Sequence, residues 1–220
     1  MKSKIFLCFT IMCLTISSCV KQESSVSPEQ KVLESSNKLV GYPPSLKDDN
    51  FYVYKNSTER SFYAPSGWMG DYGDIKLDYA CKENPYSEPT CIKFEYSAKK
   101  SQQQGWAGVY WQNPANNWGE KKGGYNLTGA KRLTFYARGE KGGEVITEFK
   151  IGGIFQGEYP DSCSNSIGPI VLTKDWKKYT IDLKGLDLSY INGGFCWVAT
   201  ANDNPEGCTF YLDDIQYEFQ

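Results

Sequence analysis

The chain has 220 residues, of which 40% are hydrophobic and 15% aromatic, and its formal net charge is −2. This length and composition fit one domain with a sizeable core. The near-neutral charge argues against the clustered lysines and arginines of a nucleic-acid-binding surface. Histidine is absent, which excludes hydrolases that use a histidine base and zinc sites with histidine ligands.

The amino-terminal residues 1–18 have the features of an export signal. Lys2 and Lys4 precede an apolar run over residues 5–16, which is shorter than a membrane-spanning helix requires. The next residues, Ile-Ser-Ser before Cys19, resemble the lipobox of bacterial lipoproteins, although isoleucine stands where leucine is more usual. The resemblance implies lipidation of Cys19 and a lipid-anchored protein of the bacterial cell envelope, at the outer membrane or cell surface. The alternative is an ordinary secretory peptide, and both place the mature protein outside the cytoplasm.

Residues 19–48 are dominated by Ser, Lys, Glu, Gln and Pro. Such a segment cannot bury enough apolar surface to fold alone. We therefore predict a flexible tether with an average end-to-end distance of roughly 30 Å. The folded domain is expected over residues 49–220.

From about residue 51, apolar and polar residues alternate with a period of two, interrupted by Gly, Pro and Asn. No stretch has a convincing helical period. Many short strands at this spacing predict an all-β domain, a two-sheet β-sandwich. The expected strands are 51–54, 75–81, 92–97, 106–112, 132–138, 145–151, 170–172, 179–183, 194–200 and 209–219. Long loops are expected at 113–124 and 152–168.

The sequence has eight cysteines, and five of them remain after the signal region, when Cys8, Cys13 and Cys19 are set aside. An exported chain permits disulfides. Two pairs flank turn-like sequences between expected strands, so we predict the disulfides Cys81–Cys91 and Cys196–Cys208. Cys163 is left over, which means that it is free or that one pairing is wrong.

Three segments resemble the strands of galactose-binding-like jelly-roll carbohydrate-binding modules, nearest to families 11 and 30. Residues 173–183 contain W-x-x-Y-x-I-D-L, residues 209–217 contain Y-L-D-D-I, and residues 133–139 contain L-x-F-x-A-R-G. The resemblance covers roughly residues 51–220. It implies a concave face that binds a polysaccharide chain, or loops that bind a chain end, and in many members a structural calcium ion near the closing strand.

Residues 104–119 combine large rings with amide side chains, the combination that holds a sugar. Strand alternation places Ala107, Val109 and Trp111 towards the core. The opposite side then carries the candidate ligand-binding residues Trp106, Tyr110 and Gln112, with Trp118 in the following loop. The other interpretation is that these rings belong to the core and the amides fill a turn.

Two further loops supply candidates. The loop at 152–168 is long enough to suggest a role, and Tyr159 is its leading candidate. Trp68 and Tyr72 lie in a glycine-rich stretch and are also candidates for ligand binding. Trp176 is expected to belong to the core.

Asp213 and Asp214 are adjacent in the closing strand and therefore point to opposite faces. The inward carboxylate needs a partner or a metal ion. We predict one structural calcium ion held by Asp213 or Asp214, with Asp74 (or Asp71) supplying further oxygens. The alternative is a hydrogen-bonded structural aspartate.

The preferred function is non-catalytic binding of a polysaccharide or oligosaccharide by a membrane-anchored, extracytoplasmic module. The alternative is a lipoprotein of the same fold that binds an envelope protein or takes part in envelope assembly. A glycoside hydrolase needs two carboxylates across a cleft. Glu95, Glu148, Glu158 and Asp161 form no recognisable pair, and polysaccharide lyases of this kind commonly use histidine, which is absent. The chain is therefore not expected to be a glycoside hydrolase or a lyase.

Overall fold

A computed structural model describes residues 50–59 and 61–220. The predicted signal peptide, Cys19 and the tether over 19–48 lie outside the described residues. Within them the only helical element is a 3-10 turn, η1 (Tyr72–Asp74). None of the described helical residues forms a helix of the length and apolarity that a bilayer requires.

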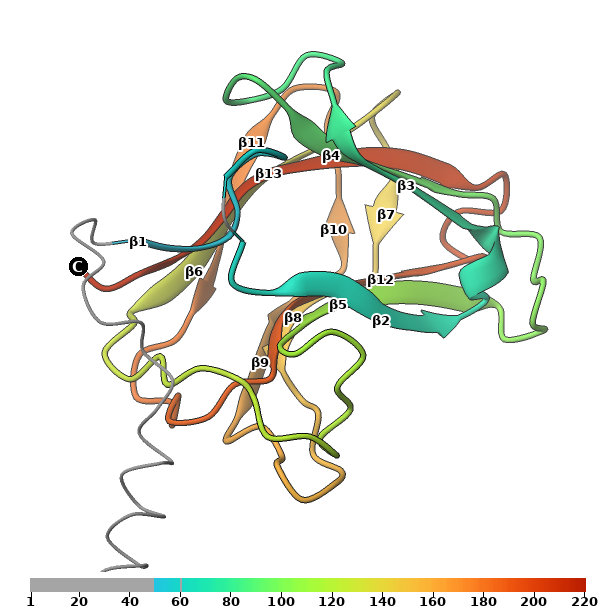
Figure 1. Cartoon of the computed structure of the whole chain (residues 1–220). Coiled ribbons are helices and arrows are strands. Elements are labelled where there is room, and N and C mark those ends of the chain that lie inside the picture. Colours follow the sequence, from blue (N-terminus) through green and yellow to red (C-terminus); the bar gives the residue numbers. More distant parts are fainter. Residues whose placement is uncertain (1–49, 60) are drawn as a thin grey trace, which may run out of the picture.

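Two antiparallel sheets lie face to face (Figure 1), which confirms the predicted two-sheet sandwich. The six-stranded sheet has the order β11-β6-β13-β4-β3, with β1 paired to β13. The five-stranded sheet has the order β2-β5-β12-β8-β9, and β7 pairs with β10 apart from both. The six-stranded sheet consists of β1 (Asn50–Tyr54), β3 (Ile75–Cys81), β4 (Cys91–Tyr96), β6 (Arg132–Gly139), β11 (Lys177–Asp182) and β13 (Cys208–Glu218). The other strands are β2 (Ala64–Gly70), β5 (Trp106–Gln112), β7 (Val145–Ile146), β8 (Glu148–Gly152), β9 (Ser164–Ile167), β10 (Ile170–Val171) and β12 (Gly193–Thr200).

Aromatic rings fill the space between the sheets. Trp111 of β5 and Trp197 of β12 are fully buried. Both lie edge-on to Phe94 of β4, with centroid distances of 5.8 Å and 4.9 Å. Ring pairs in this geometry add about 0.5–1.5 kcal/mol each beyond the area that they bury. The strand alternation predicted for residues 106–112 is therefore confirmed on its core side.

The two edge strands of the five-stranded sheet, β2 and β9, were not predicted from the sequence. β2 was expected to be mostly loop because it contains Pro65, Gly67 and Gly70. As an edge strand it tolerates proline, since one side of its backbone needs no partner. β9 lies inside the predicted loop 152–168 and has no apolar alternation, because its side chains are exposed or half-exposed. It is held by backbone pairing with β8.

Both predicted disulfides are absent, since the five described cysteines are free thiols. The Cys196–Cys208 pairing is wrong because β12 and β13 belong to different sheets. Cys196 packs outside the main core, whereas Cys208 lies within it. Cys81 and Cys91 are cross-strand neighbours in the β3–β4 register, as the hairpin prediction requires, but they are not bonded.

Glu218, near the end of β13, links three strands on the outer side of the six-stranded sheet. Its carboxylate accepts hydrogen bonds from Thr134 Oγ1 (2.7 Å), Lys178 Nζ (3.1 Å) and Arg132 Nε. Burial raises the pKa of Glu218, but the hydrogen bonds from these three side chains outweigh it and hold the pKa at about 2.

We expect Glu218→Gln to lower the free energy of unfolding at pH 7 by about 1 kcal/mol, because its cationic partners are almost half exposed and screened by water. Since the folded pKa is depressed, the stabilisation is complete above the pKa of an unfolded glutamate and is lost as the pH falls towards 2. Urea unfolding at pH 7 and pH 2.5 measures the difference. Glu206→Gln, in an exposed loop, is the control, and an undiminished loss for Glu218→Gln at pH 2.5 would contradict the assignment.

Candidate functional site

The outer face of the five-stranded sheet, which points away from the core, collects the side chains that alternate with the core rings. Gly108 of β5 pairs with Met69 of β2 and Val198 of β12. Two residues further along β5, Tyr110 pairs with Cys196 of β12, which in turn pairs with Lys150 of β8. The residues of this face therefore come from four adjacent strands.

Two long loops, residues 113–131 and 153–163, cover one half of this face. In Figure 1 both loops extend below the five-stranded sheet, and the first of them leaves from the C-terminal end of β5. Tyr110 and Gln112 lie under the loops and are 3% and 0% exposed. Tyr110 donates a hydrogen bond to the carbonyl of Gly152 (3.0 Å), and Gln112 donates one to the carbonyl of Asn117 (3.0 Å). Both residues face outward as predicted, but in this conformation they support the loops and are not open to a ligand.

Trp118 stands at the border between the covered and open halves. Its ring lies edge-on to Tyr110 at 5.8 Å and 86° and is partly exposed. Trp106, also partly exposed, begins β5 at the open end. Because Trp106 and Tyr110 are four residues apart along one strand, they are separated by roughly 13 Å. Two partly exposed tryptophans thus flank one stretch of sheet that is longer than a single sugar ring.

The surface between the two tryptophans is apolar and flat, and we call it the floor: Met69, Gly108 and Val198. Met69 and Val198 are partly exposed and close over the glycine. A Cβ at Gly108 would lie 3.0 Å from Met69 Cε, 3.2 Å from Val198 Cγ2 and 2.6 Å from the carbonyl oxygen of Trp197. A side chain here would displace both the floor and the paired strand.

Charged groups border the floor on the β8 side. Glu148 and Lys150 form an ion pair of 3.2 Å, and their side chains are 33% and 23% exposed. Lys150 Nζ also lies 5.4 Å from the centroid of the Tyr110 ring. These partly exposed side chains supply hydrogen-bond donors and acceptors beside an apolar floor, the composition that sugar hydroxyls require.

The loop 153–163 is fixed by one buried carboxylate. Asp161 accepts hydrogen bonds from the backbone amides of Ile154 (2.8 Å), Gly193 (3.2 Å) and Asn192. Burial raises the pKa of Asp161 to about 6, although the hydrogen bonds from the three amides lower the pKa in part. Tyr159 is partly exposed, and its amide donates to the carbonyl of Gly119 (2.8 Å), next to Trp118.

Trp68 and Tyr72 lie away from this face. Trp68 pairs with Val109, whose side chain is in the core, so Trp68 lies on the core side of the edge strand, where it is 37% exposed. Tyr72 is exposed on η1. The structure therefore brings Trp106, Tyr110, Gln112 and Trp118 together with the Tyr159 loop. The floor and the Glu148–Lys150 pair were missed, because only strand pairing reveals which residues meet across a sheet.

The three carboxylates predicted as calcium ligands do not form one site. Asp213 is fully buried and accepts hydrogen bonds from the amides of Tyr86 (2.9 Å), Ser87 (3.0 Å) and Asp214 (2.8 Å). Asp74 follows β2 near the opposite end of the sheet and accepts from the amide of Lys100 (2.7 Å). In the described part of the chain no three His, Cys, Asp or Glu side chains are placed to hold a metal ion. These aspartates fit the alternative of hydrogen-bonded structural residues.

Trp176, expected in the core, is also placed differently. Its ring is partly exposed and packs against Cys81, Cys91 and Tyr211, outside the main core. Trp176 immediately precedes β11 and lies beside Arg138 and Tyr211, on the outer face of the six-stranded sheet. A W-x-x-Y spacing cannot distinguish these two positions.

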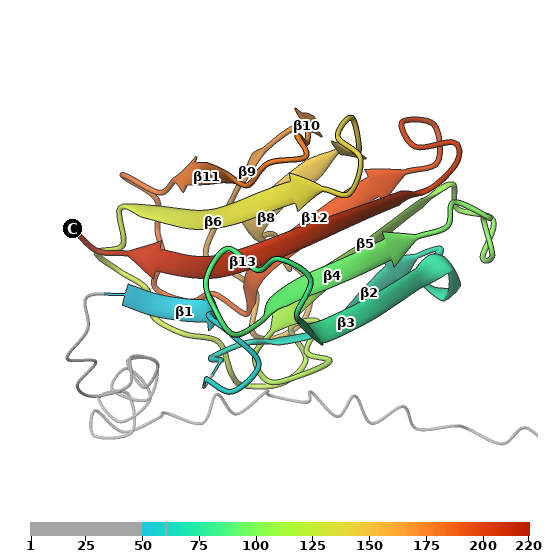
Figure 2. The same cartoon turned by 90° about the horizontal axis from the view of Figure 1, so that it is seen from above.

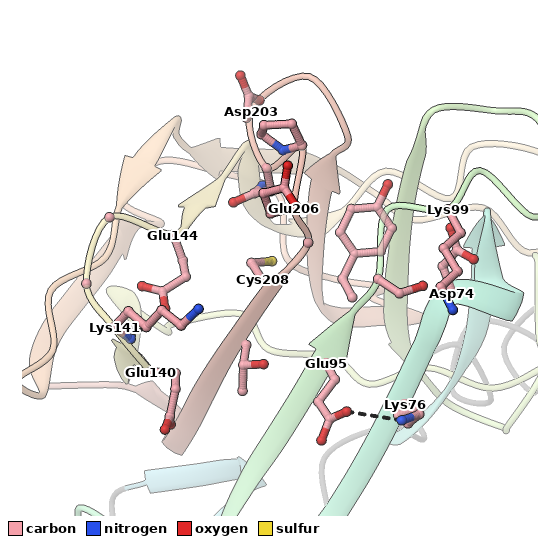
Figure 3. Close-up of a pocket in the computed structure, with 18 of the residues that line it drawn as sticks. Asp74, Lys76, Glu95, Lys99, Glu140, Lys141, Glu144, Asp203, Glu206 and Cys208 are labelled. Atoms are coloured by element: carbon pink, nitrogen blue, oxygen red, sulfur yellow. Dashed lines mark hydrogen bonds and ion pairs between the residues drawn. The ribbon is translucent and has the colours of Figure 1, made fainter.

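A separate pocket of about 590 Å³ lies where the loops after β4, β6 and β12 meet (Figure 3). Six carboxylates and three lysines line it, and Lys76 and Glu95 form an ion pair of 3.3 Å within it. The aromatic residue in its lining, Tyr96, is buried. Its charged lining therefore offers no exposed ring for sugar stacking, unlike the face between Trp106 and Trp118.

No family model and no curated protein matches the chain. Among solved structures, one crystal structure of a family 30 carbohydrate-binding module matches with a TM-score of 0.54 at 15% identity, over 78% of this chain and 99% of that one. A second matches with a TM-score of 0.52 at 15% identity, over 78% and 88%. The family 30 module of a cellulosomal cellulase of Clostridium thermocellum matches with 0.51 at 15% identity, over 76% and 96%. The chain therefore has the jelly-roll fold of these modules, as the sequence motifs predicted.

We expect Asp161→Ala to lower the free energy of unfolding by about 1–3 kcal/mol, because it leaves three buried backbone amides without an acceptor. It should also increase hydrogen exchange in residues 153–163 before the strands are affected. Glu158→Ala, an exposed residue of the same loop, is the control. Equal exchange in the two variants would show that Asp161 does not fix the loop.

Proposed function

We propose that this chain is a non-catalytic carbohydrate-binding module that holds a polysaccharide chain across the outer face of the five-stranded sheet. The observation that carries the proposal is the pair of partly exposed tryptophans, Trp106 and Trp118, at the two ends of the apolar floor. Support also comes from the fold, which is that of the family 30 modules.

Each part of the face has a role in such binding. The rings of Trp106 and Trp118 cover the CH-rich faces of pyranose units and bury apolar area. Met69 and Val198 give the floor an apolar surface, and Gly108 keeps it flat. The Glu148–Lys150 pair supplies hydrogen bonds to hydroxyl groups from the side.

The carboxylates of this face support binding without catalysis. Glycoside hydrolysis requires two carboxyl groups on either side of the scissile bond. Glu148 is the one carboxylate that the described strands place on this face, and it is paired with Lys150. Asp161 is enclosed by the loop backbone. The face therefore suits holding a glycan intact.

The proposal includes the cell location. The lipobox-like residues before Cys19 support a lipid anchor in a bacterial envelope, and the segment 19–48 would then let the domain reach a glycan away from the membrane.

We expect Cys19→Ala to abolish incorporation of a labelled fatty acid when the full chain is expressed in bacteria, and to release the protein from the membrane fraction. The parent chain and Cys163→Ser should both remain labelled. Labelling that persists in Cys19→Ala would contradict the anchor.

We expect Trp106→Ala and Trp118→Ala each to weaken polysaccharide binding by about 5- to 150-fold, because each removes a stacking ring worth about 1–3 kcal/mol. Affinity electrophoresis against soluble β-glucan, mannan and galactan measures the retardation. Val171→Ala, an exposed apolar residue of β10, is the control and should bind as the parent does. Retardation of the parent by none of these polymers, or unchanged retardation of both tryptophan variants, would contradict the proposal.

A further inference from the structure

The outer face of the six-stranded sheet carries a second group of partly exposed rings: Tyr86, Tyr136 and Trp176. Tyr86 belongs to the β3–β4 connection, residues 82–90, which crosses over β13 and β4 in Figure 2. Its ring is stacked on Tyr136 of β6, with a centroid distance of 3.4 Å and an interplanar angle of 15°. Tyr86 is nevertheless 45% exposed. One side of its ring is thus covered by Tyr136, and the other side faces solvent.

Trp176 forms a wall beside this ring. The two rings are 6.3 Å apart at 70°, so they make a corner and not a stack. The indole N–H of Trp176 donates to the carbonyl of Asn84 (2.9 Å), which fixes the ring. Behind it the guanidinium of Arg138 lies 5.3 Å from Trp176 and 3.6 Å from Tyr211, so the wall is supported by a cation–π contact.

The connection that carries Tyr86 is held by its backbone. Asp213 accepts from the amides of Tyr86 and Ser87, and Arg138 Nη2 donates to the carbonyl of Glu83 (2.9 Å). Ser87 Oγ donates to Asp214 (2.9 Å). The side chain of Tyr86 takes no part in these bonds. The corner is therefore formed before any ligand arrives, which lowers the entropy cost of binding.

A charged side chain borders the corner. Lys178 of β11 lies opposite Tyr136 in the register, and its side chain is 44% exposed. Its ammonium donates to Glu218 (3.1 Å) and is partly exposed, so it is also a hydrogen-bond donor for a sugar hydroxyl beside the open ring.

We propose that Tyr86 and Trp176 form a second saccharide-binding site, on the sheet opposite to the Trp106–Trp118 face. A pyranose unit would lie on the open side of the Tyr86 ring with its edge against Trp176. The inference rests on the proposed function for the class of ligand only. It goes beyond that function because two sites on opposite sheets allow one domain to hold two glycan chains at once.

The test uses Trp106→Ala/Trp118→Ala as the background, because it removes the first site. Affinity electrophoresis on soluble β-glucan, mannan and galactan should show residual retardation of this variant. Adding Tyr86→Ala should reduce the residual affinity at least tenfold, and adding Trp176→Ala should do the same. Adding Tyr86→Phe, which keeps the ring and removes the hydroxyl, should leave it within about twofold. Thermal unfolding confirms that each variant is folded.

The outcomes separate the two proposals. A parent that is retarded, with a Trp106→Ala/Trp118→Ala variant that is not, overturns the second site and leaves the proposed function intact. Residual retardation that Tyr86→Ala does not weaken also overturns the second site. Retardation of neither the parent nor any variant overturns both. Residual retardation that is lost with Tyr86→Ala and kept with Tyr86→Phe supports the second site whether or not the tryptophans contribute.

Discussion

The contact of aromatic rings between the two sheets is the constraint on which the rest of the structure depends. Trp111 and Trp197 from one sheet meet Phe94 from the other. Because side chains alternate along a strand, placing these rings inward sends Tyr110 and Cys196 outward. A shift of one residue in β5 would bury the outward set and expose the core. This register therefore determines which side chains of the paired strands lie on the outer faces.

Strand periodicity was sufficient to predict the sandwich, because most strands bury one side. For the same reason it correctly placed Val109 on the core side of β5 and Tyr110 on the outer side. It failed for β2, where Pro65 and Gly67 resemble loop residues, and for β9, whose short polar sequence has no buried side. β2 and β9 form strands because their backbones pair with β5 and β8. Backbone pairing leaves no alternation of apolar and polar residues in the sequence.

The candidate site was predictable only in part. The sequence identified Trp106 and Trp118, since large rings beside amides are conspicuous. It could not reveal that loops 113–131 and 153–163 fold back over Tyr110 and Gln112. The corner at Tyr86 was also hidden, because its two rings come from segments ninety residues apart. Cysteine spacing misled in a similar way: Cys196 and Cys208 flank a plausible hairpin turn, yet the chain between them crosses from one sheet to the other.

Buried aspartates hold two of the ring-bearing loops through main-chain amides: Asp161 fixes residues 153–163, and Asp213 fixes residues 82–90. Since every residue except proline has such an amide, the anchoring does not depend on which side chains the loops display. The surface chemistry can therefore change by substitution while the loop path is kept. The paths of these two loops and the side chains that they display are therefore set by different groups, so either can change without the other.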